Sequence, residues 1–391
     1  MSDPPSGVGR RGPVDDRWKV LAAASLKDAG WSMVFIYVAF ETYEAGSLLG
    51  YALIRGLPAL SYFLGTRVYG ALSDQMGARK PLLLTAAALN PLFILSLAFA
   101  PLELWLPITV VWYFLTSDEP VAIAFLADRG SGGAAAGDLF SVAELGYTAG
   151  TLAGGMLTEV FGLRTTLLVA AAVASLSVPI IYSVGEGAPA GRPDLASAFK
   201  MALSLKWPGR TGLIVPSLLL AGSAISTFYV AFSLKVFEAS GRSEAIMGLL
   251  IAGAGVAGAI VSPLYGRLVD KVGPEKAFAA SCLLYAAYFS IGALLQDFLL
   301  LAILLVLPLF ALYYSARNAL AISLASEDER ASASSVTAAV GAVSEALGNG
   351  IGGVTMSLAG LGPTMWLGAA MSALAAPALY VAWREGLRER R

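Results

Sequence analysis

The stretch GALSDQMGARK, which runs from Gly70 to Lys80, returns as GRLVDKVGPEK from Gly266 to Lys276, at an offset of 196 residues. Gly, Leu, Asp, Gly and Lys hold the same register in both copies. SDEPVAIAFLAD (117–128) likewise matches SARNALAISLAS (315–326), and YVAF (37–40) returns at 229–232. Repeats this far apart indicate two halves of equal layout, because solenoid repeats recur every 20 to 50 residues or so.

The composition places both halves in a lipid bilayer. Of the 391 residues, 57% are hydrophobic and 14% are charged, and the mean hydropathy is +0.72. Each bilayer crossing needs roughly 20 mostly apolar residues. Twelve such stretches lie between Gly, Pro or charge breaks, at 18–42, 46–71, 80–100, 104–127, 138–161 and 163–184, and at 210–237, 244–268, 275–296, 298–323, 331–359 and 363–383.

The sequence therefore predicts an all-α membrane protein, with twelve transmembrane helices in two pseudo-symmetric six-helix bundles. The linker between the bundles is the longest break in the apolar pattern, rich in Gly, Pro and charge. The expected parts are a disordered cytoplasmic leader (1–17), an N-terminal bundle (18–184), a cytoplasmic linker (185–208), a C-terminal bundle (209–384) and a basic cytoplasmic tail (385–391).

Basic residues predict the orientation, because Lys and Arg stay preferentially on the cytoplasmic side of a membrane. With the N-terminus inside, most of them fall on that side, and the loops of the other side hold Arg164, Lys235 and Arg242. We therefore expect a multi-pass protein of the plasma membrane with both termini in the cytoplasm.

The residue types that are scarce limit the chemistry. Cys282 is the single cysteine and the chain has no histidine, so disulfides, thiolate metal sites and histidine proton relays are excluded. We expect no metal and no cofactor, with a proton gradient as the energy source and carboxylates as the proton carriers.

The motif G-x-L-x-D-x-x-G-x-x-K, present after the second stretch of each half, closely resembles that of the major facilitator superfamily of secondary transporters. The resemblance covers 18–384 and is nearest to proton-coupled exporters of drugs and other solutes. It implies a substrate site near the bilayer midplane, between two halves that rock to expose it alternately to either side.

The resemblance also implies a cytoplasmic latch in which Asp74 faces the start of the stretch 331–359 and Arg79 pairs with Asp128. The alternative is a set of solvated turn residues. Gln75 and Ala78 stand where the family usually has basic residues, which thins the charge network. The candidate latch residues are Gly70, Asp74, Arg79, Asp128, Gly266 and Asp270.

Glycines predict close helix contacts. Gly70 and Gly266 remove a side chain where a helix end is expected to approach a neighbour. The segments 150–155 (GTLAGG) and 348–353 (GNGIGG) carry small residues at a spacing that lets two helices pack backbone to backbone. Exporters of the family have a proline where Thr151 stands, so this motif favours export only weakly.

Ionisable side chains within the apolar stretches cost roughly 2.5–3.5 kcal/mol each at the bilayer centre and so need a partner, a cavity or a function. Three of them, Asp28, Glu144 and Glu345, are candidate proton carriers, the alternative being static ion pairs with Arg55 or Arg317. The other candidates for the substrate cavity or a gate are the charged residues Arg55, Asp118, Glu119 and Arg317.

Glu119 and Arg317 occupy equivalent positions under the 198-residue offset and carry opposite charges. They either close an inner gate across the cavity or are neutralised within their own halves. Aromatic candidates for substrate contact are Trp31, Tyr147, Tyr229 and Tyr313, although aromatic residues of membrane proteins also serve as core or interface residues.

These residues predict a secondary transporter that moves a small organic solute by alternating access, as proton-coupled efflux of amphipathic or cationic compounds. One alternative is a proton symporter or uniporter that imports a polar nutrient, and another is a non-transporting receptor on the same scaffold. The sequence contains no recognisable nucleophile–base pair and no phosphate loop, so we do not expect an enzyme. The expected partners are a small-molecule substrate and the lipid bilayer, with no nucleic acid, and the expected state is a monomer.

Overall fold

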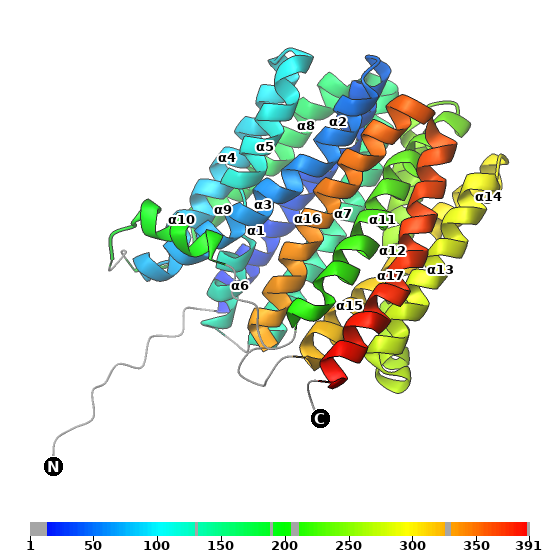
Figure 1. Cartoon of the computed structure of the whole chain (residues 1–391). Helices are drawn as coiled ribbons and strands as arrows, with labels where there is room; N and C mark the ends of the chain where they lie inside the picture. Colours follow the sequence, from blue (N-terminus) through cyan, green and yellow to red (C-terminus); the bar gives the residue numbers. More distant parts are fainter. Residues whose placement is uncertain (1–13, 130–131, 188–190, 205–210, 325–329, 389–391) are drawn as a thin grey trace.

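A computed structural model of the chain describes residues 14–129, 132–187, 191–204, 211–324 and 330–388. Helices account for most of this part of the chain (Figure 1). The first half contains α1 (Val14–Ser32), α2 (Phe35–Glu44), α3 (Leu48–Met76), α4 (Lys80–Phe99), the short 3₁₀ helix η1 (Leu102–Leu104), α5 (Trp105–Leu115), α6 (Glu119–Ala127), α7 (Gly132–Phe161), α8 (Leu163–Ser175) and α9 (Ser177–Tyr182).

The second half repeats this layout after α10 (Leu195–Leu203), a short helix inside the predicted linker. It contains α11 (Thr211–Ala239), α12 (Glu244–Val272), α13 (Pro274–Leu294), α14 (Phe298–Val306), α15 (Leu309–Ser323), α16 (Arg330–Ala359) and α17 (Leu361–Arg388). The start of α1 and the end of α17 lie at the same end of the molecule (Figure 1). We call this the terminal end and the opposite one the far end.

Each of the twelve predicted stretches coincides with one helix or with two consecutive helices. Within the described residues, eight segments are long and apolar enough to cross a membrane. Large apolar side chains on the outside, such as Leu358 (82% exposed) and Ile260 (70%), fit a surface that faces lipid. The all-helical membrane fold predicted from the sequence is confirmed.

Prolines explain two of the breaks inside predicted stretches. Between α5 and α6 the helix is interrupted at 116–118, and Pro120 lies in the first turn of α6. Between α14 and α15 the interruption falls at Leu307 and Pro308. Proline has no N–H for the helical ladder and its ring clashes with the preceding turn, so it favours a helix start over a helix interior.

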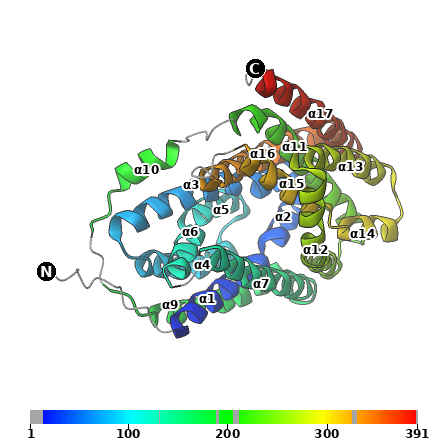
Figure 2. The same cartoon turned by 90° about the horizontal axis from the view of Figure 1, so that it is seen from below.

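The two bundles meet along two helix pairs, α3 with α16 and α7 with α12. A continuous apolar core also joins them, since the ring of Phe40 on α2 stacks on Phe237 of α11 with 4.1 Å between centroids. Both rings are fully buried. Seen from the terminal end, the helices of the two bundles surround a central region (Figure 2).

Glycines permit close packing within each bundle, as the sequence predicted. A Cβ atom on Gly150 of α7 would overlap α1, one on Gly154 would overlap Met33 just after α1, and one on Gly348 or Gly352 of α16 would overlap α11. These two helix pairs, α1 with α7 and α11 with α16, are equivalent in the two halves and have extensive contacts.

The next glycine of each set faces the other bundle instead. Gly155 lies against the carbonyl of Glu244 at the start of α12, and Gly353 lies against Ala52 on α3. The two glycines are themselves 198 residues apart. Each repeat therefore has glycines that join a helix to its own bundle and one that joins it to the opposite bundle.

The predicted close approach at Gly70 and Gly266 is wrong for this conformation. A Cβ atom at either position would meet nothing within 4 Å, so neither glycine is needed for a helix contact here. The glycine that the motif does require is Gly77, which ends α3 in the left-handed conformation with a φ of 60°.

Candidate functional site

Three aromatic side chains of the first bundle meet near the middle of the molecule. The indole N–H of Trp31 on α1 donates to the hydroxyl of Tyr113 on α5 at 2.7 Å. The ring of Tyr147 on α7 lies 5.7 Å from that of Trp31, centroid to centroid. All three are half-buried, so each ring keeps apolar surface that a flat organic molecule can contact.

Glu345 on α16 and Arg55 on α3 lie close together where the two bundles meet. The backbones approach there, since a Cβ atom on Gly56 would lie 3.3 Å from the Cα of Ala346. The charge of Arg55 acts on the exposed Glu345 carboxylate, yet no direct ion pair joins them among the residues described. Arg55 instead donates to the hydroxyl of Tyr51 at 2.6 Å. The carboxylate is therefore left available to a proton or a ligand.

The aromatic residues and the charged pair form one site, which we call the central site. Tyr113 of the first bundle and Tyr314 of the second both lie near Glu345, and Tyr147 lies near Arg55. Both bundles contribute to the central site, so a bound molecule would contact both bundles.

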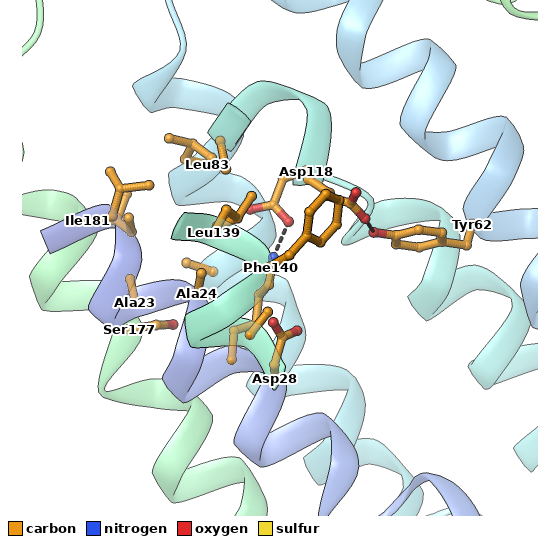
Figure 3. Close-up of a pocket in the computed structure, with 16 residues that line it drawn as sticks. Ala23, Ala24, Asp28, Tyr62, Leu83, Asp118, Leu139, Phe140, Ser177 and Ile181 are labelled. Atoms are coloured by element: carbon orange, nitrogen blue, oxygen red, sulfur yellow. Dashed lines mark hydrogen bonds and ion pairs between the residues drawn. The ribbon is translucent and has the colours of Figure 1, made fainter. Parts of the chain in front are cut away.

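A second group of charges lies within the first bundle, around Lys27 on α1. Its amine pairs with the carboxylate of Asp118, at the break before α6. Figure 3 shows Asp28 and Asp118 on neighbouring elements, with Tyr62 reaching in from α3. Asp28 is affected by the charges of Lys27, Asp118, Glu119 and Glu144. Three carboxylates, those of Asp28, Asp118 and Glu119, thus lie near one amine, an excess of negative charge that favours protons and cations.

A cavity of about 90 Å³ reaches this charge group. One water molecule needs roughly 10–15 Å³ by the same measure, so several fit. Asp28, Asp118 and Glu119 line the cavity together with apolar residues of α4, α7 and α9. Water therefore has access to the carboxylates that the sequence predicted for proton exchange or for the cavity.

Glu144 connects this charge group with the opposite bundle. It lies on α7, is exposed, and forms no ion pair within the described residues. Its Oε1 is 3.0 Å from the point that a Cβ atom on Gly255 of α12 would occupy. Glu144 thus faces the boundary between α7 and α12, as a proton carrier between the bundles would.

Glu119 and Arg317 do not pair with each other in this conformation. Glu119 accepts a hydrogen bond from the hydroxyl of Tyr62 at 2.6 Å. Arg317 lies over the ring of Tyr314, 4.8 Å from its centroid, and beside Gly341 of α16. Each charge is accommodated within its own bundle, so a gate between them would have to form in another conformation.

At the terminal end, the repeated motif forms a small charge network. Arg79 contacts Asp74 at 3.0 Å and Asp128 at 3.6 Å, so the ion pair with Asp128 that the resemblance implied is present. Asp270 is exposed at the end of α12. The side chains that begin α16, which Asp74 was expected to face, lie outside the described residues, and the latch role itself stays a prediction.

At the far end, polar contacts join the two bundles directly. Glu159 of α7 accepts hydrogen bonds from the Ser243 hydroxyl and from the backbone N–H of Ala245, the latter at 2.8 Å. Its carboxylate thus caps the first turn of α12, where helix dipoles favour a negative charge. The hydroxyl of Tyr51 donates to the carbonyl of Val230 at 3.0 Å. These contacts hold the far end closed.

Replacing Glu159 by alanine should open the far end more often. Removing a helix-capping acceptor costs about 0.5–2 kcal/mol, and 1.4 kcal/mol corresponds to a tenfold change in population. Ala52 is buried behind the contact with Gly353. We expect a cysteine introduced by Ala52→Cys to react with a maleimide about tenfold faster in Glu159→Ala than in the protein that keeps Glu159. The background is low because Cys282 is 1% exposed. Glu44→Ala, at the same end, is the control, and an unchanged rate in Glu159→Ala would contradict this role.

Sequence reasoning missed some participants and misplaced others. It did not select Lys27 or Tyr62, whose partners are 91 and 57 residues away. It preferred Tyr313, which is 3% exposed and packed on Phe278 and Tyr285, over the exposed Tyr314. Tyr229 lies in the aromatic core of the second bundle, with its hydroxyl 3.4 Å from that of Tyr288. The signal for Tyr314 was its helical spacing from Arg317.

Comparison with known proteins supports the family. The model of the Major Facilitator Superfamily matches residues 214–390. The multidrug resistance protein MdtG of Rahnella sp. is 27% identical over 262 residues, 64% of this chain and 63% of that protein. A multi-drug resistance efflux pump PmrA homolog of Lactococcus lactis is 26% identical over 229 residues, 56% of each chain. The chain thus aligns with somewhat under two thirds of these relatives' lengths.

Solved structures match over nearly the whole chain. A bacterial homolog of the human lysosomal transporter Spinster, inward-facing and unoccupied, has a TM-score of 0.78 at 14% identity, covering 96% of this chain and 98% of that one. The nucleoside transporter NupG has a TM-score of 0.74 at 12% identity, covering 94% and 99%. The fold is therefore that of these two structures, with the helices in two bundles. The match of the family model to residues 214–390 agrees with the resemblance to the major facilitator superfamily that the sequence predicted.

Proposed function

We propose that this protein exports small amphipathic or cationic organic compounds in exchange for protons. The observation that carries the proposal is the central site, where the exposed Glu345 of one bundle faces Arg55 and the aromatic residues of the other. A carboxylate beside aromatic rings attracts an organic cation, and protonation of the same carboxylate would release it.

The surrounding charges favour the same class of substrate. Around Lys27, three carboxylates lie near one amine, so the first bundle presents an excess of negative charge to the interior. The relatives named for multidrug resistance and efflux support export of organic compounds over import of a polar nutrient. Proton exchange at Asp28, Glu144 and Glu345 would supply the energy.

The conformation supports alternating access. Contacts between the bundles are concentrated at the far end and at the middle, while Gly70 and Gly266 at the terminal end have no close neighbours. If the terminal end is cytoplasmic, as the basic residues predict, this conformation takes up substrate from the cytoplasm. Rocking of the bundles about the central site would then deliver it outside.

A flux measurement tests the proposal. The purified protein is reconstituted in liposomes with an inside-acid gradient, and internal pH is followed while organic cations, neutral drugs and polar nutrients are added in turn. We expect cationic compounds to dissipate the gradient as they accumulate inside. Uptake of a labelled solute that leaves the gradient unchanged would contradict proton exchange, and a solute that moves with protons would indicate a symporter.

A further inference from the structure

The helix α10 carries an apolar face that the rest of the protein covers only in part. Leu195, Phe199 and Leu203 follow one another at a spacing of four residues and are 60%, 43% and 69% exposed. At this spacing they lie along one side of a helix. The adjoining side, with Ala198 and Ala202, is buried against α3.

Specific contacts fix α10 in this orientation. Arg67 on α3 donates to the carbonyls of Ala202 at 2.6 Å and Ser204 at 3.0 Å, which completes the C-terminal end of α10. At its start, the backbone N–H of Asp194 donates to the side-chain carbonyl of Gln75 at 2.8 Å. Both views place α10 at the outer edge of the bundle, beside α3 (Figures 1 and 2).

The depth of α10 follows from the length of α3. With 29 residues and a rise of about 1.5 Å each, α3 is roughly 43 Å long, which exceeds the hydrocarbon thickness of about 30 Å. The helix α10 packs on the last turns of α3, between Arg67 and Gln75, at the terminal end. These turns reach the boundary between hydrocarbon and lipid headgroups, so α10 lies at that boundary.

The charges near α10 suit a phospholipid surface. Lys200 is the only charged residue within the helix and is exposed, as is the neighbouring Arg192. The carboxylate of Asp194 is engaged instead, since it accepts from the backbone N–H groups of Ala196 and Ser197. Two of these three charges are therefore basic, which complements anionic headgroups.

We propose that α10 is a membrane-surface helix whose apolar face, formed by Leu195, Phe199 and Leu203, inserts into the lipid leaflet at the terminal end. This inference does not depend on the transported solute. It has a mechanical consequence, because Arg67 joins α10 to α3 and α3 contacts α16 of the other bundle. Lipid thus holds the linker against a helix that must move during transport.

Spin labels measure the insertion directly. Single cysteines replace Leu195, Leu203, Ser197 or Lys200 in the full chain carrying Cys282→Ser, and each labelled protein is reconstituted in phosphatidylcholine vesicles with phosphatidylglycerol. We expect labels at 195 and 203 to collide several-fold more with oxygen than with a water-soluble nickel chelate. Labels at 197 and 200 should show the reverse preference.

Two outcomes would overturn the proposal. Nickel accessibility at all four positions would place α10 in water, and exclusion of both reagents from 195 and 203 would mean that protein covers the face.

The oxygen preference should persist in pure phosphatidylcholine, because the apolar side chains carry the insertion. A Leu195→Asn, Leu203→Asn variant labelled at Phe199→Cys should gain nickel accessibility, and a circular dichroism spectrum checks that it remains folded.

Discussion

Replacing Glu345 by glutamine should abolish proton-coupled movement of solute while leaving the fold intact. The glutamine keeps the shape of the side chain but cannot exchange a proton. Loss of a group that transfers protons lowers rates by roughly 10²–10⁴-fold in enzymes, and we expect the gradient-driven flux to fall by at least about 100-fold. Exchange of labelled for unlabelled substrate should persist, because it needs no net proton transfer.

The control for this variant is Glu41→Gln, an exposed carboxylate at the far end of α2. Asp28→Asn and Glu144→Gln, measured in the same liposomes, show whether the proton passes through the charge group of the first bundle as well. Wild-type coupling in Glu345→Gln would remove the central carboxylate from the mechanism. Loss of both coupled flux and exchange would assign it to substrate binding alone.

Replacing Lys27 by methionine should destabilise the protein strongly. The amine is the counter-charge of Asp118, which is 5% exposed, and it also lies beside Asp28. Removing one partner of a buried ion pair leaves an uncompensated charge and costs about 3–5 kcal/mol. We expect the melting temperature, followed by tryptophan fluorescence in detergent, to fall by roughly 5 °C or more.

A second substitution separates lost charge from lost packing. Adding Asp118→Asn to Lys27→Met removes the unpaired carboxylate and should restore most of the melting temperature. Arg242→Ala is the control, because its ion pair with Glu238 is exposed and such pairs contribute only about 0–1 kcal/mol. A double variant as unstable as Lys27→Met alone would show that the pair is not the source of the stability.

The fold could be predicted because its signals lie in continuous sequence. Apolar runs of membrane length and the repeated phrase at Gly70 and Gly266 define helices and halves without any knowledge of contacts. The breaks within stretches were not predicted, although Pro308 marks one of them. The helix α10 was missed since nine residues in a polar linker carry too short a pattern to stand out.

The site was only partly predictable, because its interactions join residues that are distant in sequence. Glu345, Asp28 and Trp31 could be selected from the sequence, since an ionisable or amphipathic side chain in an apolar helix needs a reason to be there, and their roles stay predictions. Their partners come from other helices. Lys27 pairs with a residue 91 positions away, and the Arg55 that faces Glu345 belongs to the other bundle, which no local pattern specifies.

The conformation could not be predicted at all. The sequence must serve both the open and the closed states, so motifs for each are present together. Gly155 and Gly353 make their contacts in this structure, whereas Gly70 and Gly266 make none. We expect the latter two to gain close neighbours when the terminal end closes, since the motif that contains them would then meet the opposite bundle.

Distances at the two ends of the molecule test alternating access most directly. In a Cys282→Ser background, one spin-label pair occupies Gly137→Cys and Gly266→Cys, terminal-end positions where a side chain meets nothing within 4 Å. The other pair occupies Ala45→Cys and Ala239→Cys, exposed at the far end. We predict that Glu159→Ala lengthens the far-end distance and shortens the terminal-end distance together. A change at one end alone, or the same change at both, would contradict rocking about the central site.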